Sequence, residues 1–191
     1  IFPFPILSKM ERGSADGDKK IAPNGNQNIW MFEVLGREIV DLTNGVPVLF
    51  FNAASTGTLV SNWSETADDE SKITSSPWTI NCNTEIEQWA SDGAEGQPYK
   101  GLRTSLNYYG GMFGARAVLW QQGESDNFLN TPTSTYFNAL KKVIERSRQH
   151  FDNRLGWAIS LVSHFPPNQN NTAITQAQRQ VKNTMANTTW G

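Results

Sequence analysis

Apolar runs and amphipathic helical patterns alternate along this chain from residue 28 to residue 185. Three apolar runs are predicted as strands: residues 46–51, 115–120 and 155–162. Four stretches with apolar residues every three or four positions are predicted as helices: residues 28–42, 98–112, 133–151 and 172–185. Strands joined through helices favour right-handed crossovers, a parallel sheet and helices on both of its faces. The alternation therefore predicts an α/β protein with three layers, α/β/α.

Length and composition narrow the possible functions. We predict a single domain over residues 1–191, since this length suffices for one core. A net charge of −2 gives no reason to expect nucleic acid as a partner. No run approaches the ~18 apolar residues of a membrane span, so no membrane partner is expected. Cys82 is the only cysteine, and His150 and His164 are the only histidines, which argues against a metal site. We expect no metal and no cofactor, and the oligomeric state stays open.

A long polar and aromatic stretch interrupts the pattern. Residues 61–99 are predicted as an insertion loop with a short helix near residues 85–89. Loops of this length are usually functional or mobile. Trp63, Trp78 and Trp89 lie within it. Their rings suit either stacking on sugars or packing as loop anchors, and the sequence leaves both interpretations open.

Polar loops follow each of the three predicted strands: residues 52–58, 121–127 and 163–168. The carboxyl ends of parallel strands share one edge of a sheet, where ligands bind in such folds, so we expect these loops to converge. The Gln122 amide and the backbone N–H of Gly57 are suitable donors for one oxyanion hole. The alternative is an ordinary strand-to-helix loop capped by Ser125 or Asp126.

The two histidines have different expected roles. His164 follows the third predicted strand, where it could bind substrate hydroxyls or act as a base, or be an ordinary loop histidine beside Phe165. His150 lies at the end of a predicted helix and is interpreted as a favourable contact with the helix dipole.

The run Trp120-Gln121-Gln122-Gly123-Glu124-Ser125-Asp126 resembles a block of one enzyme family. That block is Trp-x-Gln-Gly-Glu-Ser-Asp of the sialate O-acetylesterase-like carbohydrate esterases, a branch of the SGNH hydrolases. Further stretches resemble the same family over about residues 28–190: residues 47–58 with Trp63, residues 98–102 with 108–110, and residues 156–157 with 174–181.

The resemblance implies a serine esterase that removes acetyl or similar acyl groups from sugars, on a flavodoxin-like three-layer SGNH fold. It implies that Gln122 serves the oxyanion hole and that Gly57 supplies a backbone N–H, although this chain has Thr56-Gly57 where the family usually has two glycines. Glu124 is expected to hold its loop or a neighbouring side chain by hydrogen bonds, the alternative being a solvated carboxylate. Residues expected to bind the substrate are Asn52, Trp63, Asp126 and His164.

Two blocks of the family are absent from the 191 residues: the Gly-Gln-Ser-Asn nucleophile block and the Asp-x-x-His base block. A nucleophile needs an oriented base. We therefore expect that the sequence holds the middle of an incomplete catalytic domain, inactive alone. Two other functions stay open: a non-catalytic carbohydrate-binding module with the same fold, and a flavodoxin-like domain that binds another small molecule.

The expected partner is an acylated carbohydrate. The content of asparagine, threonine and serine suits an exported protein, so a secreted or periplasmic location is expected, although no signal peptide is visible in the sequence.

Overall fold

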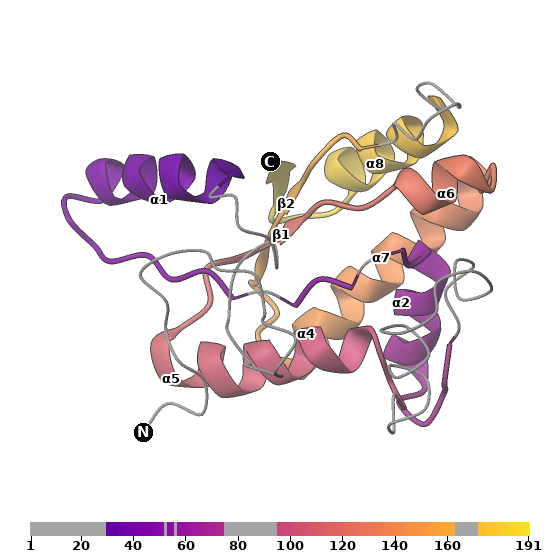
Figure 1. Cartoon of the computed structure of the whole chain (residues 1–191), viewed down its shortest axis with the longest axis horizontal. Coiled ribbons are helices and arrows are strands. Elements are labelled where there is room, and N and C mark those ends of the chain that lie inside the picture. The colour runs from indigo at the N-terminus through magenta and orange to yellow at the C-terminus, as the bar shows by residue number, and fades with distance from the viewer. Residues whose placement is uncertain (1–29, 52, 56, 75–94, 163–171) are drawn as a thin grey trace, which may run out of the picture. The chain divides into compact units, whose positions relative to one another are not determined.

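The computed structural model describes residues 30–51, 53–55, 57–74, 95–162 and 172–191 (Figure 1). The chain divides into two compact units, residues 1–54 and residues 55–191, and each is described by itself. The predicted helix near residues 85–89 lies outside the described residues.

The first unit contains helix α1, Trp30–Leu42, as the apolar spacing predicted. Asn44 and Gly45 end it with φ angles of +54° and +92°, and the Gly45 N–H donates to the Val40 carbonyl at 2.8 Å. This is the usual way in which an Asn-Gly pair closes a helix. The predicted strand at residues 46–51 is wrong, because these residues form no strand ladder. An apolar run supplies side chains that can be buried, but a strand also needs backbone hydrogen-bond partners. The apolar side chains of this run are also not all buried, since Leu49 is 48% exposed.

The second unit is built on a parallel sheet of three strands, in the order β1-β2-β3. The strands are β1 Ala117–Trp120, β2 Gly156–Ile159 and β3 Thr188–Trp190. Helix α7, Thr133–His150, connects β1 to β2, and helix α8, Thr172–Thr184, connects β2 to β3. The predicted α/β class with a parallel sheet is confirmed.

One face of this sheet packs on helices. The Trp157 indole N–H donates to the Ser147 hydroxyl of α7 at 3.2 Å, and the Trp120 indole N–H donates to the Tyr136 hydroxyl of α7 at 3.4 Å. Burial alternates along β1, because Trp120 is buried whereas Leu119, which points to the opposite face, is 40% exposed. The described part of this unit therefore covers β1 mainly from one side, where the sequence predicted cover on both.

Further helices lie in the described part of the second unit. They are α2 Val60–Asp68, α4 Tyr99–Ser105, which continues as the π-helix Leu106–Gly110, α5 Gly111–Phe113, and α6 Glu124–Phe128. The helix predicted over residues 98–112 is confirmed, with Leu102, Leu106 and Tyr109 buried and Met112 50% exposed. Helix α2 was not predicted, because residues 61–99 were interpreted as a loop.

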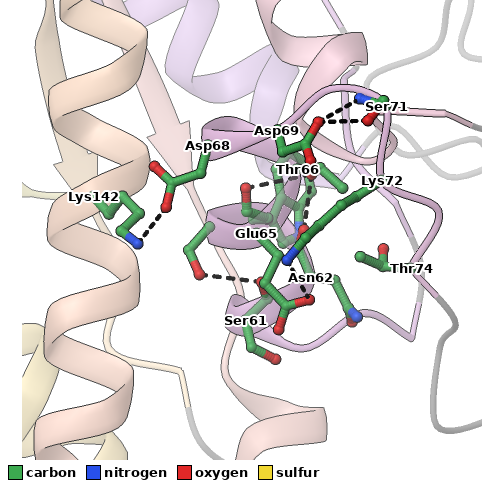
Figure 2. Close-up of polar contacts among 12 residues, drawn as sticks. Ser61, Asn62, Glu65, Thr66, Asp68, Asp69, Ser71, Lys72, Thr74 and Lys142 are labelled. Carbon is green, nitrogen blue, oxygen red and sulfur yellow. Dashed lines mark hydrogen bonds and ion pairs between the residues drawn. The ribbon is translucent and has the colours of Figure 1, made fainter.

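Helix α2 lies beside α7 (Figure 1). Asp68 at the end of α2 pairs with Lys142 at 2.5 Å and Arg146 at 3.2 Å, both on α7, and Figure 2 shows the Lys142 contact. The hydrogen bond from Lys142 lowers the pKa of Asp68 below its ordinary value. Val60 and Ala67 bury the apolar side of α2. This helix thus fixes the segment that leads into it, residues 57–59, against the rest of the unit.

None of the helices in the described ranges is long and apolar enough to cross a membrane.

Candidate functional site

The turn after β1 meets the end of β2 at the carboxyl edge of the sheet. Gly123 lies in this turn, and a Cβ atom on it would overlap the Val162 carbonyl oxygen. Only glycine fits so close an approach of two backbones. The loops that follow β1 and β2 therefore converge, as predicted, while residues 163–168 of the second loop lie outside the described residues.

The Gln122 side chain is held at three points. Its Nε2 donates to the Thr58 carbonyl at 3.0 Å and to Asp126 Oδ2 at 2.6 Å, and its Oε1 accepts from the Tyr136 hydroxyl at 3.0 Å. A backbone carbonyl only accepts hydrogen bonds, which places the nitrogen of the amide on the side of Thr58. The side chain is 9% exposed. Both amide hydrogens thus point at identified partners, one of them toward the segment that contains Gly57.

That segment is a tight turn before α2. Gly57 has a φ of +69°, a conformation that favours glycine. The next residue, Thr58, donates its hydroxyl to the Ser55 carbonyl at 3.0 Å and accepts from the Trp63 indole N–H at 2.9 Å. Because the Gln122 amide contacts the Thr58 carbonyl, the structure brings Gln122 and Gly57 to the same edge. Their roles as oxyanion donors stay a prediction.

Asp126 is 1% exposed, so it lies inside the protein. Its Oδ2 accepts from Gln122 and from the backbone N–H of Val60, the latter at 2.9 Å. Burial raises the pKa of this carboxyl, while hydrogen bonds from Gln122, Val60 and Thr131 oppose that rise. Its expected contact with substrate stays untested, and the contacts described here are all with the protein itself.

Glu124 opens α6 and is half-buried. Its Oε1 accepts from the Gln121 side-chain amide at 3.0 Å and its Oε2 accepts from the Gly123 N–H at 3.1 Å. Both partners belong to the turn that Glu124 follows. These contacts are of the loop-holding kind expected from the sequence, whereas a part in catalysis stays a prediction.

Two buried residues of the site were not singled out from the sequence. Gln178 of α8 is 0% exposed and donates to the Gln122 carbonyl at 3.1 Å and the Val162 carbonyl at 2.9 Å. The Tyr136 hydroxyl donates to the Gln122 carbonyl at 2.7 Å, and burial raises its pKa. Gln178 falls four residues after Ile174 on the inner face of α8, so a polar residue on an apolar face was the available signal.

Trp63 is 5% exposed and its ring packs edge-on against Trp120, with 5.2 Å between ring centroids. A ring so enclosed offers no face to a sugar. Of the two interpretations of Trp63, stacking on a sugar or packing as a loop anchor, the structure therefore favours packing. Two other residues expected to bind substrate, Asn52 and His164, lie outside the described residues.

His150 lies at the end of α7, as predicted. Its Nδ1 shares a hydrogen bond with the Tyr99 hydroxyl at 2.9 Å. Burial, followed by the charges of Arg103 and Arg146, lowers the imidazole pKa, against the opposing effect of Glu70. The lowered pKa favours the neutral imidazole, so a charged contact with the dipole of α7 stays a prediction.

An open depression of about 550 Å³ lies at the opposite edge of the sheet, where the strands begin. Its lining residues precede or start the strands and are Ala115, Arg116, Asp152, Arg154, Leu155, Gly156 and Asn187. None of the predicted site residues lines it. Over the described ranges, no group of three or more histidine, cysteine, aspartate or glutamate residues is arranged to hold a metal ion.

Comparison with known proteins identifies a family. The family model described as "Carbohydrate esterase, sialic acid-specific acetylesterase" matches residues 78–190, which is more than half of the 191 residues. The match includes Gln122, Glu124 and Asp126, whereas Gly57 and Trp63 precede it. No curated protein and no solved structure matches the chain.

Proposed function

Because the chain belongs to the carbohydrate esterase family of sialic acid-specific acetylesterases, we propose that it is part of a serine-type esterase that removes acetyl or similar acyl groups from sugars. Family membership makes an acetylesterase-like activity the general expectation, with a carbohydrate as substrate. The observation that carries the finer proposal is the Gln122 amide, held 3.0 Å from the carbonyl of Thr58, the residue after Gly57.

In this reaction a serine attacks the ester carbonyl, and the carbonyl oxygen becomes an oxyanion. The Gln122 N–H and the Gly57 N–H stabilise that charge. The base, which takes the proton of the serine hydroxyl during the attack, returns it to the sugar oxygen as the tetrahedral intermediate collapses and the bond between the acyl carbon and that oxygen breaks. Water then attacks the acyl-serine, passes a proton through the base to the serine oxygen, and releases the free acid. The serine and the base belong to the Gly-Gln-Ser-Asn and Asp-x-x-His blocks of the family, neither of which occurs in the 191 residues.

The amide hydrogen that now points at the Thr58 carbonyl is the one assigned to the oxyanion. The other hydrogen is held by Asp126 Oδ2 at 2.6 Å, which is the shorter of the two bonds and the harder to exchange. A shift of the Thr58 carbonyl or of the amide then frees a donor on the Gly57 side. Catalytic hydrogen bonds commonly form only in the substrate complex, so such an exchange is ordinary.

Hydrolysis of p-nitrophenyl acetate and of O-acetylated sialic acid by the full-length protein tests this proposal. Gln122→Ala is expected to lower kcat by roughly 10²-fold, the usual effect of one oxyanion donor. Gln176→Ala, which removes an exposed glutamine of α8, is the control and should leave kcat unchanged. An unchanged rate in a folded Gln122→Ala protein would remove Gln122 from the mechanism. Sugar binding without hydrolysis by the full-length protein would instead support the non-catalytic module.

Export is part of the same proposal, since the content of asparagine, threonine and serine suits an exported protein. Cell fractionation should place the full-length protein outside the cytoplasm, and recovery in the cytoplasm alone would contradict this location.

A further inference from the structure

We propose that Asp126 is a positioning residue, which ties together the two chain segments that supply the oxyanion donors. One segment is residues 57–60, with Gly57, and the other is the turn at residues 122–123, with Gln122. A single carboxylate oxygen, Asp126 Oδ2, accepts from Gln122 Nε2 at 2.6 Å and from the Val60 N–H at 2.9 Å. This inference rests on the proposed function, because it concerns the same donors.

The first contact fixes the direction of the Gln122 amide. Asp126 holds one hydrogen of Nε2, and the Tyr136 hydroxyl contacts Oε1 at 3.0 Å. With these two positions occupied, the remaining hydrogen can only point toward the Thr58 side. Loss of the carboxylate would let the amide turn about its last torsion, which is soft for a glutamine. The donor would then spend only part of its time aimed at the reacting oxygen.

The second contact fixes the other segment. Val60 is the first residue of α2, and the N–H groups of a first helical turn have no partner within their own helix. Asn62 Oδ1 accepts from the Leu59 N–H at 2.8 Å, and Asp126 accepts from the next N–H along the chain. The turn that carries Gly57 is therefore held to the Gln122 turn across 66 residues of sequence.

The position of Asp126 argues against direct contact with substrate. Its side chain is 1% exposed, whereas Glu124 on the same short helix is half-buried. A group so enclosed acts on the reaction through the donors it holds. Its effect should therefore appear in kcat, which depends on donor placement in the transition state, and little in KM.

Asp126→Ala is the informative variant in the full-length protein, because it removes the oxygen that accepts from both segments. We expect kcat to fall by about 10- to 100-fold, with KM within about twofold of the wild type. Asp126→Asn is the conservative comparison: with its amide oxygen in the place of Oδ2 it accepts both hydrogen bonds, so its kcat should lie within about fivefold of the wild type. In Asp126→Ala/Gln122→Ala, the loss of kcat should be smaller than the product of the two single losses, because the part that acts through Gln122 is lost only once. Fully multiplied losses, or an Asp126→Ala kcat within twofold of wild type, would overturn the proposal.

Val60→Pro tests the second contact without changing Asp126. Proline is favoured as the first residue of a helix, and Leu59 has the extended conformation that a following proline requires, with φ −84° and ψ 154°. The substitution removes the N–H that Asp126 accepts, and we expect kcat to fall by about fivefold or more. This variant also tests the proposal if Asp126→Ala fails to fold. An unchanged kcat would overturn the tie between the two segments.

Asp152→Ala is the matched control. Asp152 also accepts a backbone N–H, that of Arg154 at 2.8 Å, together with a side-chain donor of the same residue. It precedes β2 and so lies at the edge of the sheet away from Gln122. The kcat of this control variant should equal that of the wild type. If Gln122→Ala itself has no effect, the proposed function has failed; if only Gln122→Ala slows the reaction, the role of Asp126 has failed alone.

Discussion

Single buried residues around Gln122 satisfy one another's hydrogen bonds. Gln178 accepts from the Val162 N–H at 3.0 Å and donates to the Val162 carbonyl, so it replaces a strand partner after β2 has ended. A buried donor or acceptor left without a partner costs about 1–3 kcal/mol, so each member of this group depends on the others. Because these polar groups are paired with one another, removal of one side chain leaves a hydrogen-bond donor or acceptor of another without its partner.

Gly123→Ala tests how close the turn after β1 lies to β2. The new methyl group would overlap the Val162 carbonyl, which is backbone and cannot rotate away. We expect the free energy of unfolding to fall by about 2–4 kcal/mol, measured by urea denaturation. Gly111→Ala is the control, because Gly111 is helical and nothing lies within 4 Å of its added Cβ. That variant should be as stable as wild type or up to about 1 kcal/mol more stable. Equal effects of the two substitutions would contradict the close approach.

Residues of the candidate site were easier to single out from the sequence than the contacts that hold them. Gln122 and Asp126 belong to a recognisable block that follows an apolar run, so their residue types and spacing were enough to single them out. Tyr136 lies in a predicted helix, but the partner of its hydroxyl could not be deduced, since a hydrogen bond across 14 residues depends on how α7 is oriented. The enclosure of Asp126 was equally out of reach, because burial follows from packing rather than from residue type.

At the scale of elements, the strongly amphipathic helices were predictable and the short strands were not. The helix predicted over residues 133–151 is confirmed as α7, and one of its faces is buried: Tyr136, Leu140, Val143, Ile144 and Ser147. Long periodic segments carry this information in every turn. Strand β3 has only three residues, and its backbone pairs with β2 without any alternation long enough to detect. The run at residues 46–51 is the opposite case, because it has the apolar sequence of a strand but no backbone pairing with a neighbouring strand.

Helix α7 is expected to be held mainly by its buried face rather than by its ion pairs with α2. Leu140→Ala, at a position 0% exposed, should lower the free energy of unfolding by about 2–5 kcal/mol in chemical denaturation. Asp68→Ala breaks the contacts with Lys142 and Arg146, yet should cost less than about 1 kcal/mol, because these side chains are 38–45% exposed and water screens them.

Leu129→Ala supplies the matched control for that comparison, since Leu129 is 46% exposed and lies outside α7. It should change the stability by no more than about 0.5 kcal/mol. A loss from Asp68→Ala as large as that from Leu140→Ala would show that the ion pairs, not the apolar face, fix α7 to α2.

At the scale of the whole molecule, the sequence predicted the parallel sheet but not the division of the chain. Helices and strands that alternate along a chain connect parallel strands through crossovers, whatever the exact bounds of each element. The α/β class could therefore be predicted from the order of the elements alone. The division into residues 1–54 and 55–191 depends on which surfaces meet. A pattern of apolar residues shows that a helix has a face to bury, but it does not show what covers that face.

This division predicts unequal protection from hydrogen exchange. Helix α1 leaves Val34 60% and Leu42 81% exposed, whereas Leu140 and Val143 of α7 are 0% exposed. Backbone amides exchange through local openings, whose free energy grows with the apolar surface that an opening exposes. Amides in the middle of α1 should therefore exchange at least about 100-fold faster than those in the middle of α7, as measured by hydrogen exchange with mass spectrometry. Exchange at the same rate in both helices would mean that the two units open as one, and that α1 owes its stability to burial comparable with that of α7.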